Sequence, residues 1–345
     1  MAITKRQNII NFSDGAEPTV AIYFGPAAAG HHSSLLQRFS SPRLDWLPEK
    51  MARRLVRGSH ILICRSLTTR WIDFLSSNRS LIAGISYLCD DDLAAGSEAT
   101  ELPSEYRERL GKIMHEQWPR LLNLADELVV TSRALARRFA NEHRKVALLE
   151  PTMILPPPCT GHFSRGELTL LFHGTRAHLF DFFHIAPAVL QLLKKNEGIR
   201  LESLLGRFTP EAVRNHPKVR CIEPMPWPKF RQFMARKRVH IGLVPLLETP
   251  FNSGKSHVKF LEIASMGGVG VYSRRPPYED IVEHGVDGLL VEDDPRAWLD
   301  ALQSLVHDRE WARQMAEAAG EKARRIGDPV IASRFWQARA RPRVM

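Results

Sequence analysis

The sequence predicts an α/β protein in which two doubly wound domains face a central cleft. Short apolar segments alternate with helical segments in both halves of the 345-residue chain, and a proline-rich segment separates the halves. This alternation is typical of parallel sheets that helices cover on both faces. A chain of this length can bury two hydrophobic cores. Because ligands of such domains bind at the carboxyl ends of parallel strands, the cleft is the expected ligand site.

The first domain is expected in residues 1–150, where the alternation is less regular than in the second half. We expect strands at 19–25, 59–66, 80–89, 127–132 and 145–151, and helices at 49–57, 104–125 and 133–143. This half is therefore predicted to be the smaller α/β domain, and residues 151–167 are predicted to be a linker. The proline run in that linker cannot continue a helix or a central strand, so it is expected to be semi-rigid.

The second domain is expected in residues 168–330. We expect strands at 168–174, 199–206, 219–224, 239–246, 269–273 and 288–292. Helices are expected at 181–195, 228–238, 257–266, 278–285, 295–308 and 309–325. Six strands of this kind make a complete doubly wound domain.

The net charge of +10 suggests an anionic partner, which could be nucleic acid, a membrane surface or a phosphorylated substrate. Residues 331–345 are expected to be a basic tail, with Arg334, Arg339, Arg341 and Arg343 and no acid among them. Such a tail suits anionic lipid headgroups, although it could equally be a solvated terminus. Nucleic acid is not expected as a partner, because the sequence lacks interleaved aromatic residues and any known binding module.

The expected location is the cytoplasm, with peripheral contact at the inner face of the membrane. No apolar run approaches 18 residues, and the N-terminal segment lacks the apolar core of a secretory signal. The four cysteines are far apart and form no CxxC pair, which argues against a zinc site or a disulfide framework.

The segment 252–262, NSGKSHVKFLE, carries the clearest functional signal. Lys255, Lys259 and Glu262 stand at i, i+4 and i+7 and share one face of the helix that follows the strand 239–246. A helix start that Ser253 or Ser256 caps, together with two lysines, would bind a phosphate or diphosphate. A carboxylate two turns along could accept hydrogen bonds from a sugar's hydroxyl groups. The alternative is a solvated charge pattern on a surface helix.

Residues around this segment carry a resemblance to a known family. Pro250, Phe251, Asn252, Lys255, Ser256, Lys259 and Glu262 match a pattern of retaining GT-B glycosyltransferases, group 1 or family 4-like, and GVDGLLVE at 285–292 matches the turn before their last strand. The similarity covers residues 168–325 and is faint over 1–150. It implies the GT-B fold, two Rossmann-like domains that face a cleft, and a nucleotide-diphosphate sugar as the donor.

The resemblance also implies roles for individual residues. Lys255 would contact the donor diphosphate with Ser256 and Lys259 nearby, Glu262 would hold the ribose, and Asn252 would position the loop. Arg176 would add a second cation. The residues expected to face the cleft in this loop are Thr175, Arg176, His178 and Asp181, and the base would lie near 206–209 and 223–227. Many members carry a glutamate eight positions before Glu262, where this chain has Gly254.

Two further segments are candidate parts of the site. Asp90, Asp91 and Asp92 follow a strand, and we expect them to face the cleft, with Asp91 orienting or deprotonating the acceptor hydroxyl. The alternatives are a metal site like that of GT-A enzymes and a charged loop in which one aspartate caps a helix. The segment 24–34 resembles a loop that approaches the donor phosphates, with Gly30 permitting close approach and His31 and His32 as contacts. It could equally be a connector.

Together these features predict a retaining glycosyltransferase of polysaccharide biosynthesis. Lys255, Glu262, Arg176 and Asp91 are the catalytic candidates. The resemblance implies no metal and no cofactor besides the donor substrate, since fixed cations and a helix dipole would stabilise the leaving diphosphate. The acceptor would be a glycan or a lipid-linked glycan. The alternative is a non-catalytic GT-B-like scaffold that binds a nucleotide-sugar or a partner protein.

Overall fold

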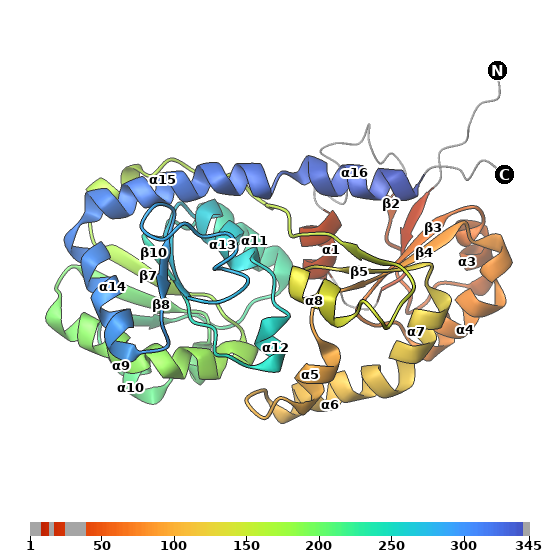
Figure 1. The fold of residues 1–345 in the computed structure, drawn as a ribbon, viewed down its shortest axis with the longest axis horizontal. Helices are drawn as coiled ribbons and strands as arrows, with labels where there is room; N and C mark the ends of the chain where they lie inside the picture. The colour runs from red at the N-terminus through yellow and green to blue at the C-terminus, as the bar shows by residue number, and fades with distance from the viewer. Residues whose placement is uncertain (1–7, 14–16, 25–38, 341–345) are drawn as a thin grey trace, which may run out of the picture.

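The computed structural model describes residues 8–13, 17–24 and 39–340, and Figure 1 shows their arrangement as two domains side by side. Each domain contains one parallel six-stranded sheet. The predicted α/β class with two doubly wound domains is therefore confirmed. The residue limits that the sequence analysis sets for the two domains stay predictions.

The N-terminal sheet has the strand order β2-β1-β3-β4-β5-β6. Its strands are β1 (Ile9–Asn11), β2 (Phe39–Ser40), β3 (His60–Cys64), β4 (Gly84–Cys89), β5 (Glu127–Val130) and β6 (Val146–Leu148). Its helices are α1 (Glu17–Phe24), α3 (Glu49–Val56), α4 (Thr69–Ser77), α5 (Leu93–Glu98), α6 (Ser104–Lys112), α7 (Trp118–Leu124) and α8 (Arg133–Arg138), with a π-helical turn at Ile113–Gln117 joining α6 to α7. Ile61 and Ile63 enter one apolar cluster and Leu62 another, so this sheet is covered on both faces.

The C-terminal sheet has the order β12-β11-β10-β7-β8-β9, which is the dinucleotide-fold order with its reversal between β7 and β10. Its strands are β7 (Leu168–Phe172), β8 (Ile199–Ser203), β9 (Val219–Cys221), β10 (Ile241–Val244), β11 (Val269–Ser273) and β12 (Leu289–Val291). Its helices are α9 (Leu179–Lys195), α10 (Glu211–Arg214), α11 (Trp227–Arg236), α12 (Pro250–Ser253), α13 (Val258–Ser265), α14 (Pro295–His307) and α15 (Arg309–Ile326). The strand reversal creates a crevice at the carboxyl ends of β7 and β10.

Two predicted elements are wrong. Residues 19–25 are predicted as the first strand, but Glu17–Phe24 is the helix α1 and the first strand is β1. A short apolar run does not distinguish a strand from a helix that is buried on several sides, and here Val20, Tyr23 and Phe24 are all buried. Residues 278–285 are predicted as a helix, but they form turns. The Asp287 carboxylate accepts the Glu283 N–H at 2.9 Å, and the Gly285 N–H bonds to the Gly288 carbonyl, so local turn bonds replace helical ones.

The C-terminal end of the chain is a packed helix as far as Arg339. Figure 1 shows α15 and α16 (Pro329–Arg339) running along one edge of the molecule, from the C-terminal domain onto the N-terminal domain. Trp336 is fully buried there, donates its indole N–H to the Tyr23 carbonyl at 2.9 Å and stacks on Phe24. This corrects the expectation of a basic tail for residues 331–339, because burying Ala332 and Trp336 in the apolar cluster that contains Tyr23 and Phe24 is favourable. Arg341 and Arg343 lie outside the described residues.

The chain crosses between the domains twice, at neighbouring positions. The predicted linker begins with Thr152 and Met153, whose backbone N–H groups bond to the carbonyls of Ile22 and Gly327 at 3.0 and 2.8 Å. The second crossing, at Gly327, therefore lies beside the first. In the part of the chain that the structure describes, no helix combines the length and apolar character needed to cross a bilayer.

Candidate functional site

The two domains meet through a buried ion pair between two predicted site residues. The ammonium Nζ of Lys255 lies 2.7 Å from Oδ1 of Asp91, and their side chains are 16% and 9% exposed. Asp91 follows β4 in the N-terminal domain, while Lys255 lies between α12 and α13 in the C-terminal domain. The lysine ammonium also lies 3.8 Å from the centre of the Phe251 ring, which gives a cation–π contact. The cation expected to bind a diphosphate is thus held here by a protein carboxylate.

Arg65 is a member of this cluster that the sequence analysis missed. It directly follows β3 with φ of 60°, a left-handed backbone conformation that residues other than glycine rarely adopt. Its Nε lies 2.8 Å from Asp90 Oδ1, and its Nη2 bonds to Asp91. A cation at the carboxyl end of one strand, next to a strand ending in three aspartates, is the signal that could have found it.

The aspartates of the cluster differ in basicity. Burial alone would raise the pKa of Asp91, but Lys255 and Arg65 together lower it below its usual value. Burial raises the pKa of Asp90, which Arg65 opposes. Asp91 is therefore an ionised but weak base, since both of its oxygens already bind cations.

Asp92 serves a different purpose from the other two aspartates. Its Oδ1 accepts the backbone N–H of Ala95 at 3.0 Å and so caps α5, while its Oδ2 lies 3.4 Å from Arg138. One aspartate thus has the capping role that was left open as an alternative. Among the residues that the structure describes, no group of three or more His, Cys, Asp and Glu side chains could hold a metal ion. Metal independence itself stays a prediction.

Two neutral contacts join the domains beside the ion pair. The hydroxyl groups of Tyr23 and Ser256 lie 2.7 Å apart, and both are buried. The Ser132 hydroxyl donates to the Gly254 carbonyl at 2.9 Å. A Cβ atom at Gly254 would lie 2.9 Å from Leu135 Cδ2 and 3.4 Å from the Asp92 nitrogen. A glutamate, which many members of the resembled family carry at this position, would not fit while the domains are in contact.

Glu262 lies at the crevice between β7 and β10. Its Oε2 is 2.7 Å from the Lys259 ammonium and 3.0 Å from Nε2 of His173, the residue that follows β7. Glu262 is 6% exposed. Burial tends to raise the pKa of Glu262, but Lys259 and His173 lower it to about 2, so the carboxylate is ionised at neutral pH. His173 was given no role from sequence, and its place before a glycine at a strand end is the signal that points to it.

His173 is neutral at physiological pH and acts as a hydrogen-bonding group. Burial, followed by the Lys259 charge, lowers its pKa to about 4. A cavity of about 20 Å³ lies next to this group, with His173, Gly174, Lys259 and Tyr278 among its lining residues. The crevice is therefore nearly filled by the protein's own side chains.

Asp181 joins the two loops that carry the candidate residues. This carboxylate is 2% exposed and accepts hydrogen bonds from the Leu247 backbone N–H at 2.8 Å and the Asn252 amide at 3.1 Å. Its other oxygen bonds to His178 Nδ1 at 2.8 Å. Asn252 also donates to the Leu247 carbonyl at 3.0 Å and so holds the loop before α12.

The remaining candidates lie away from the ion pair or cannot be placed. Arg176 is 3.9 Å from Glu105 on α6, across the domain boundary, and its guanidinium covers the Phe208 ring at 4.3 Å. These contacts do not bring Arg176 to Lys255. Thr175 is exposed at the start of the same loop. Gly30, His31 and His32 lie outside the described residues.

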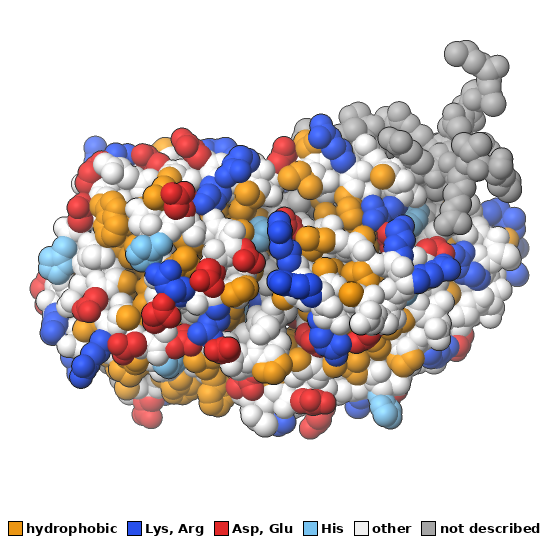
Figure 2. Space-filling model, in the orientation of Figure 1, with side chains coloured by type: hydrophobic (Ala, Val, Ile, Leu, Met, Phe, Trp, Pro, Cys, Tyr) orange, Lys and Arg blue, Asp and Glu red, His pale blue; other side chains and the backbone are white. Residues whose placement is uncertain are grey.

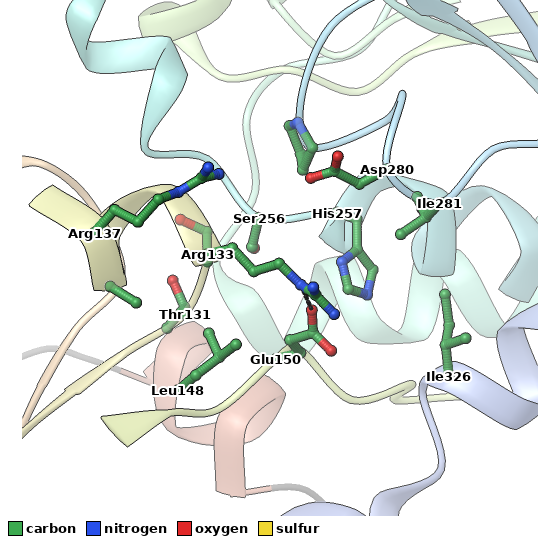
Figure 3. A pocket seen from close by; sticks show the side chains of 13 residues that line it. Thr131, Arg133, Arg137, Leu148, Glu150, Ser256, His257, Asp280, Ile281 and Ile326 are labelled. Carbon is green, nitrogen blue, oxygen red and sulfur yellow. Dashed lines mark ion pairs between the residues drawn. The ribbon is translucent and has the colours of Figure 1, made fainter. Parts of the chain in front are cut away.

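A second cavity, of about 660 Å³, lies between the domains, and Ser256 lies in its wall (Figure 3). This volume is in the range of small-molecule sites. The N-terminal domain contributes Arg133, Arg137 and Glu150, and the C-terminal domain contributes His257 and Asp280. Arg133 and Glu150 form a long ion pair of 3.9 Å. The wall is charge-balanced, with apolar residues between its charged groups, among them Leu148, Ile281 and Ile326.

Comparisons with known proteins agree with this architecture. Residues 187–338 match a family described as glycosyl transferase-like. No curated protein matches the sequence. Sucrose-phosphate synthase from Thermosynechococcus elongatus has a similar structure, with 14% identity, a TM-score of 0.62, and coverage of 97% of this chain and 98% of that one.

Two further structures are similar and were solved with ligands. Anabaena HepE in complex with UDP and glucose is 13% identical, with a TM-score of 0.64 and coverage of 96% of this chain and 99% of that one. The pneumococcal O-GlcNAc transferase GtfA in complex with UDP and GlcNAc is 11% identical, with a TM-score of 0.57 and coverage of 85% and 58%. The expected GT-B fold is confirmed by these likenesses.

Proposed function

We propose that this protein is a retaining glycosyltransferase that transfers a sugar from a nucleotide-diphosphate sugar to an acceptor hydroxyl, without a bound metal. The observation that carries the proposal is the ionised Glu262, which lies at the carboxyl end of β7 with Lys259 and His173 against it. A fixed carboxylate in this crevice suits the paired hydroxyls of a ribose. The match to a glycosyl transferase-like family and the GT-B fold support the same reading.

The diphosphate of the donor would lie at the start of α13. The residue that precedes this helix, His257, makes no side-chain capping bond, and its carbonyl accepts the Phe260 N–H at 3.0 Å. The N–H groups of Val258 and Lys259 are therefore the ones that would face an anion. Lys255 lies directly before this turn and would pair with the diphosphate. As the bond to the sugar breaks, negative charge accumulates on the leaving diphosphate, and these fixed groups stabilise it.

Donor binding in this scheme requires Lys255 to exchange one anion for another. In the structure Lys255 bonds to Asp91, so the diphosphate displaces this carboxylate. Asp91 would then turn toward the acceptor hydroxyl. Because cations hold the pKa of Asp91 low, we assign it the positioning of the acceptor rather than the removal of its proton. The acceptor would be a glycan or a lipid-linked glycan, as the family resemblance implies.

The test is a screen of UDP-, GDP- and dTDP-sugars by thermal shift, followed by calorimetry with the donor that binds. Lys255→Ala and Glu262→Ala should each weaken the binding of that donor at least tenfold while the protein stays folded. Lys194→Ala, an exposed lysine at the end of α9, is the control and should bind normally. Unchanged affinity in a folded Glu262→Ala variant would sink the assignment of the crevice.

A non-catalytic scaffold is the second candidate, and one observation favours it. The Lys255–Asp91 pair joins the two domains and occupies the cation that the donor diphosphate would need. Turnover assays with the bound donor and a mixture of glycan acceptors separate the two functions. Donor binding without sugar transfer or donor hydrolysis supports the scaffold, whereas transfer with the same anomeric configuration supports the enzyme.

A further inference from the structure

Two large apolar side chains that are five positions apart in the sequence are exposed on the N-terminal domain. Trp46 is 67% exposed and Met51 is 55% exposed. Trp46 belongs to the loop between β2 and α3, and Met51 belongs to the first turn of α3. The Arg43 guanidinium lies 5.7 Å from the centre of the Trp46 indole. Exposed apolar side chains beside charged groups are a feature of interaction surfaces when they form a patch.

A stripe of cations continues from this apolar pair along α3. Lys50 and Arg54 stand at i and i+4 on one face of α3, Arg57 directly follows the helix, and all three are exposed. The opposite face buries Ala52 and Val56 in the core. Within residues 39–340, none of the three cations forms an ion pair with a carboxylate. We call the residues Arg43, Trp46, Lys50, Met51, Arg54 and Arg57 the Trp46 surface.

The Trp46 surface retains a positive charge after its acids are considered. Arg43 pairs with Asp45 at 3.3 Å, and Glu49 is the other acid of the segment. Three cations of the stripe remain available. Figure 2 shows Lys and Arg side chains gathered at the end of the molecule where α3 lies. The surface thus combines two exposed apolar side chains with unpaired positive charge, and this combination complements an anionic and partly apolar partner.

The loop that carries Trp46 is fixed at the edge of the sheet that faces the cleft. The Asn11 amide at the end of β1 donates to the Ser41 hydroxyl at 3.1 Å. The Trp71 indole N–H donates to the Leu44 carbonyl at 3.2 Å. Since parallel strands end at the same edge, this loop and the cluster of Arg65 and Asp91 lie at the same edge of the sheet. The loop of the Trp46 surface therefore begins at this edge, whereas α3 lies at the end of the N-terminal domain away from the C-terminal domain (Figure 1).

We propose that the Trp46 surface docks on an anionic lipid bilayer. Trp46 and Met51 enter the headgroup region, where an indole contacts both apolar and polar groups, and the cations of α3 face the anionic headgroups. The protein would then stay at the membrane in which a lipid-linked acceptor is anchored. The link to a lipid-linked acceptor rests on the proposed function, whereas the docking does not. Docking through α3 differs from the predicted contact through the arginine tail, one member of which, Arg339, pairs with the buried Glu127.

The test is co-sedimentation of the full chain with vesicles of phosphatidylcholine alone and of phosphatidylcholine mixed with phosphatidylglycerol. The protein should bind the anionic vesicles only, and added salt should weaken the binding. Two variants are compared with it, Lys50→Glu/Arg54→Glu/Arg57→Glu and Trp46→Ser/Met51→Ser. Each should lower the vesicle affinity at least tenfold. The matched control is Lys194→Glu/Lys195→Glu/Arg296→Glu, which makes the same charge change at exposed sites on α9 and α14.

Several outcomes would overturn the docking. The wild type could ignore anionic vesicles, the control could lose as much affinity as the α3 variant, or the Trp46→Ser/Met51→Ser variant could bind normally. Binding of single-stranded RNA that competes with the vesicles would identify a nucleic-acid surface instead. Calorimetry with the nucleotide-sugar keeps this test apart from that of the proposed function. The Trp46-surface variants should bind the donor normally. If the wild type binds vesicles but binds no donor, only the proposed function is refuted.

Discussion

Replacing Asp91 with asparagine should strengthen the binding of a nucleotide diphosphate. In the structure the Asp91 carboxylate occupies Lys255, the cation that the proposed mechanism gives to the diphosphate. Asparagine keeps the size of the side chain but removes the competing negative charge. A site residue whose removal improves ligand binding is an unusual expectation, and it follows directly from the observed ion pair.

The magnitude follows from the geometry of the pair. Two unit charges at 2.7 Å attract by about 6 kcal/mol at an effective dielectric constant of about 20. Desolvation of the two largely buried groups cancels most of this, and Arg65 continues to act on the site in the variant. We take about 1.4 kcal/mol of this attraction as the expected gain in binding free energy, which corresponds to about tenfold tighter binding.

The assay is calorimetric titration of the wild type, Asp91→Asn and Asp90→Asn with the nucleotide diphosphate of the donor that the screen identifies. Asp90 is the matched control, because it bonds to Arg65 and Thr19 and feels the Lys255 charge only weakly, after those of Arg65 and Asp91. Its variant should change the affinity much less. If Asp91→Asn binds the diphosphate more weakly than the wild type or equally well, Asp91 does not compete for Lys255. The proposed exchange of anions would then be wrong.

Two further predictions concern stability. The lowered pKa of Glu262, about 2, means that this carboxylate stabilises the fold above its unfolded pKa of about 4.5, and that the contribution is lost as the pH falls from there toward 2. Urea titrations of Glu262→Gln should therefore give an unfolding free energy that changes less with pH in this window, by on the order of 2 kcal/mol across it. Glu321→Gln, an exposed control, should match the wild type. An equal pH dependence of the unfolding free energy in all three proteins would reject the buried ion pair. Gly254→Ala should destabilise the protein by about 1–3 kcal/mol, because the added methyl group overpacks against Leu135. In a double-mutant cycle, Gly254→Ala should cost less stability when Leu135 is already replaced by alanine. Simple additivity of the two substitutions would show that the domains do not press on Gly254.

Much of the fold could be predicted from the alternation of strands and helices. The strands β7 to β12 and the helices α9, α11, α13, α14 and α15 lie within a few residues of the predicted ranges. The prediction was weakest at the N-terminus, where β1 is three residues long and α1 is an apolar run. Local pattern cannot resolve such segments, because their burial depends on α16, which arrives from the other end of the chain.

The candidate site was predictable only in part. The residues of 252–262 could be assigned to the start of a helix, and Glu262 does lie at the crevice. Its partner His173 is 89 positions away, and the Lys255–Asp91 pair joins residues 164 positions apart. Arg65 and Tyr23 enter the cluster from segments that carry no recognisable motif.

The sequence by itself determined where strands alternate with helices, and therefore the two parallel sheets. The spacing of hydrophobic residues that produces this alternation is a local property of the chain. It also placed cations and carboxylates at the junctions of strands with helices. Only the tertiary structure decided which cation meets which carboxylate. Electrostatic attraction depends on the distance between groups, and that distance is set where the carboxyl ends of two separate sheets are brought together.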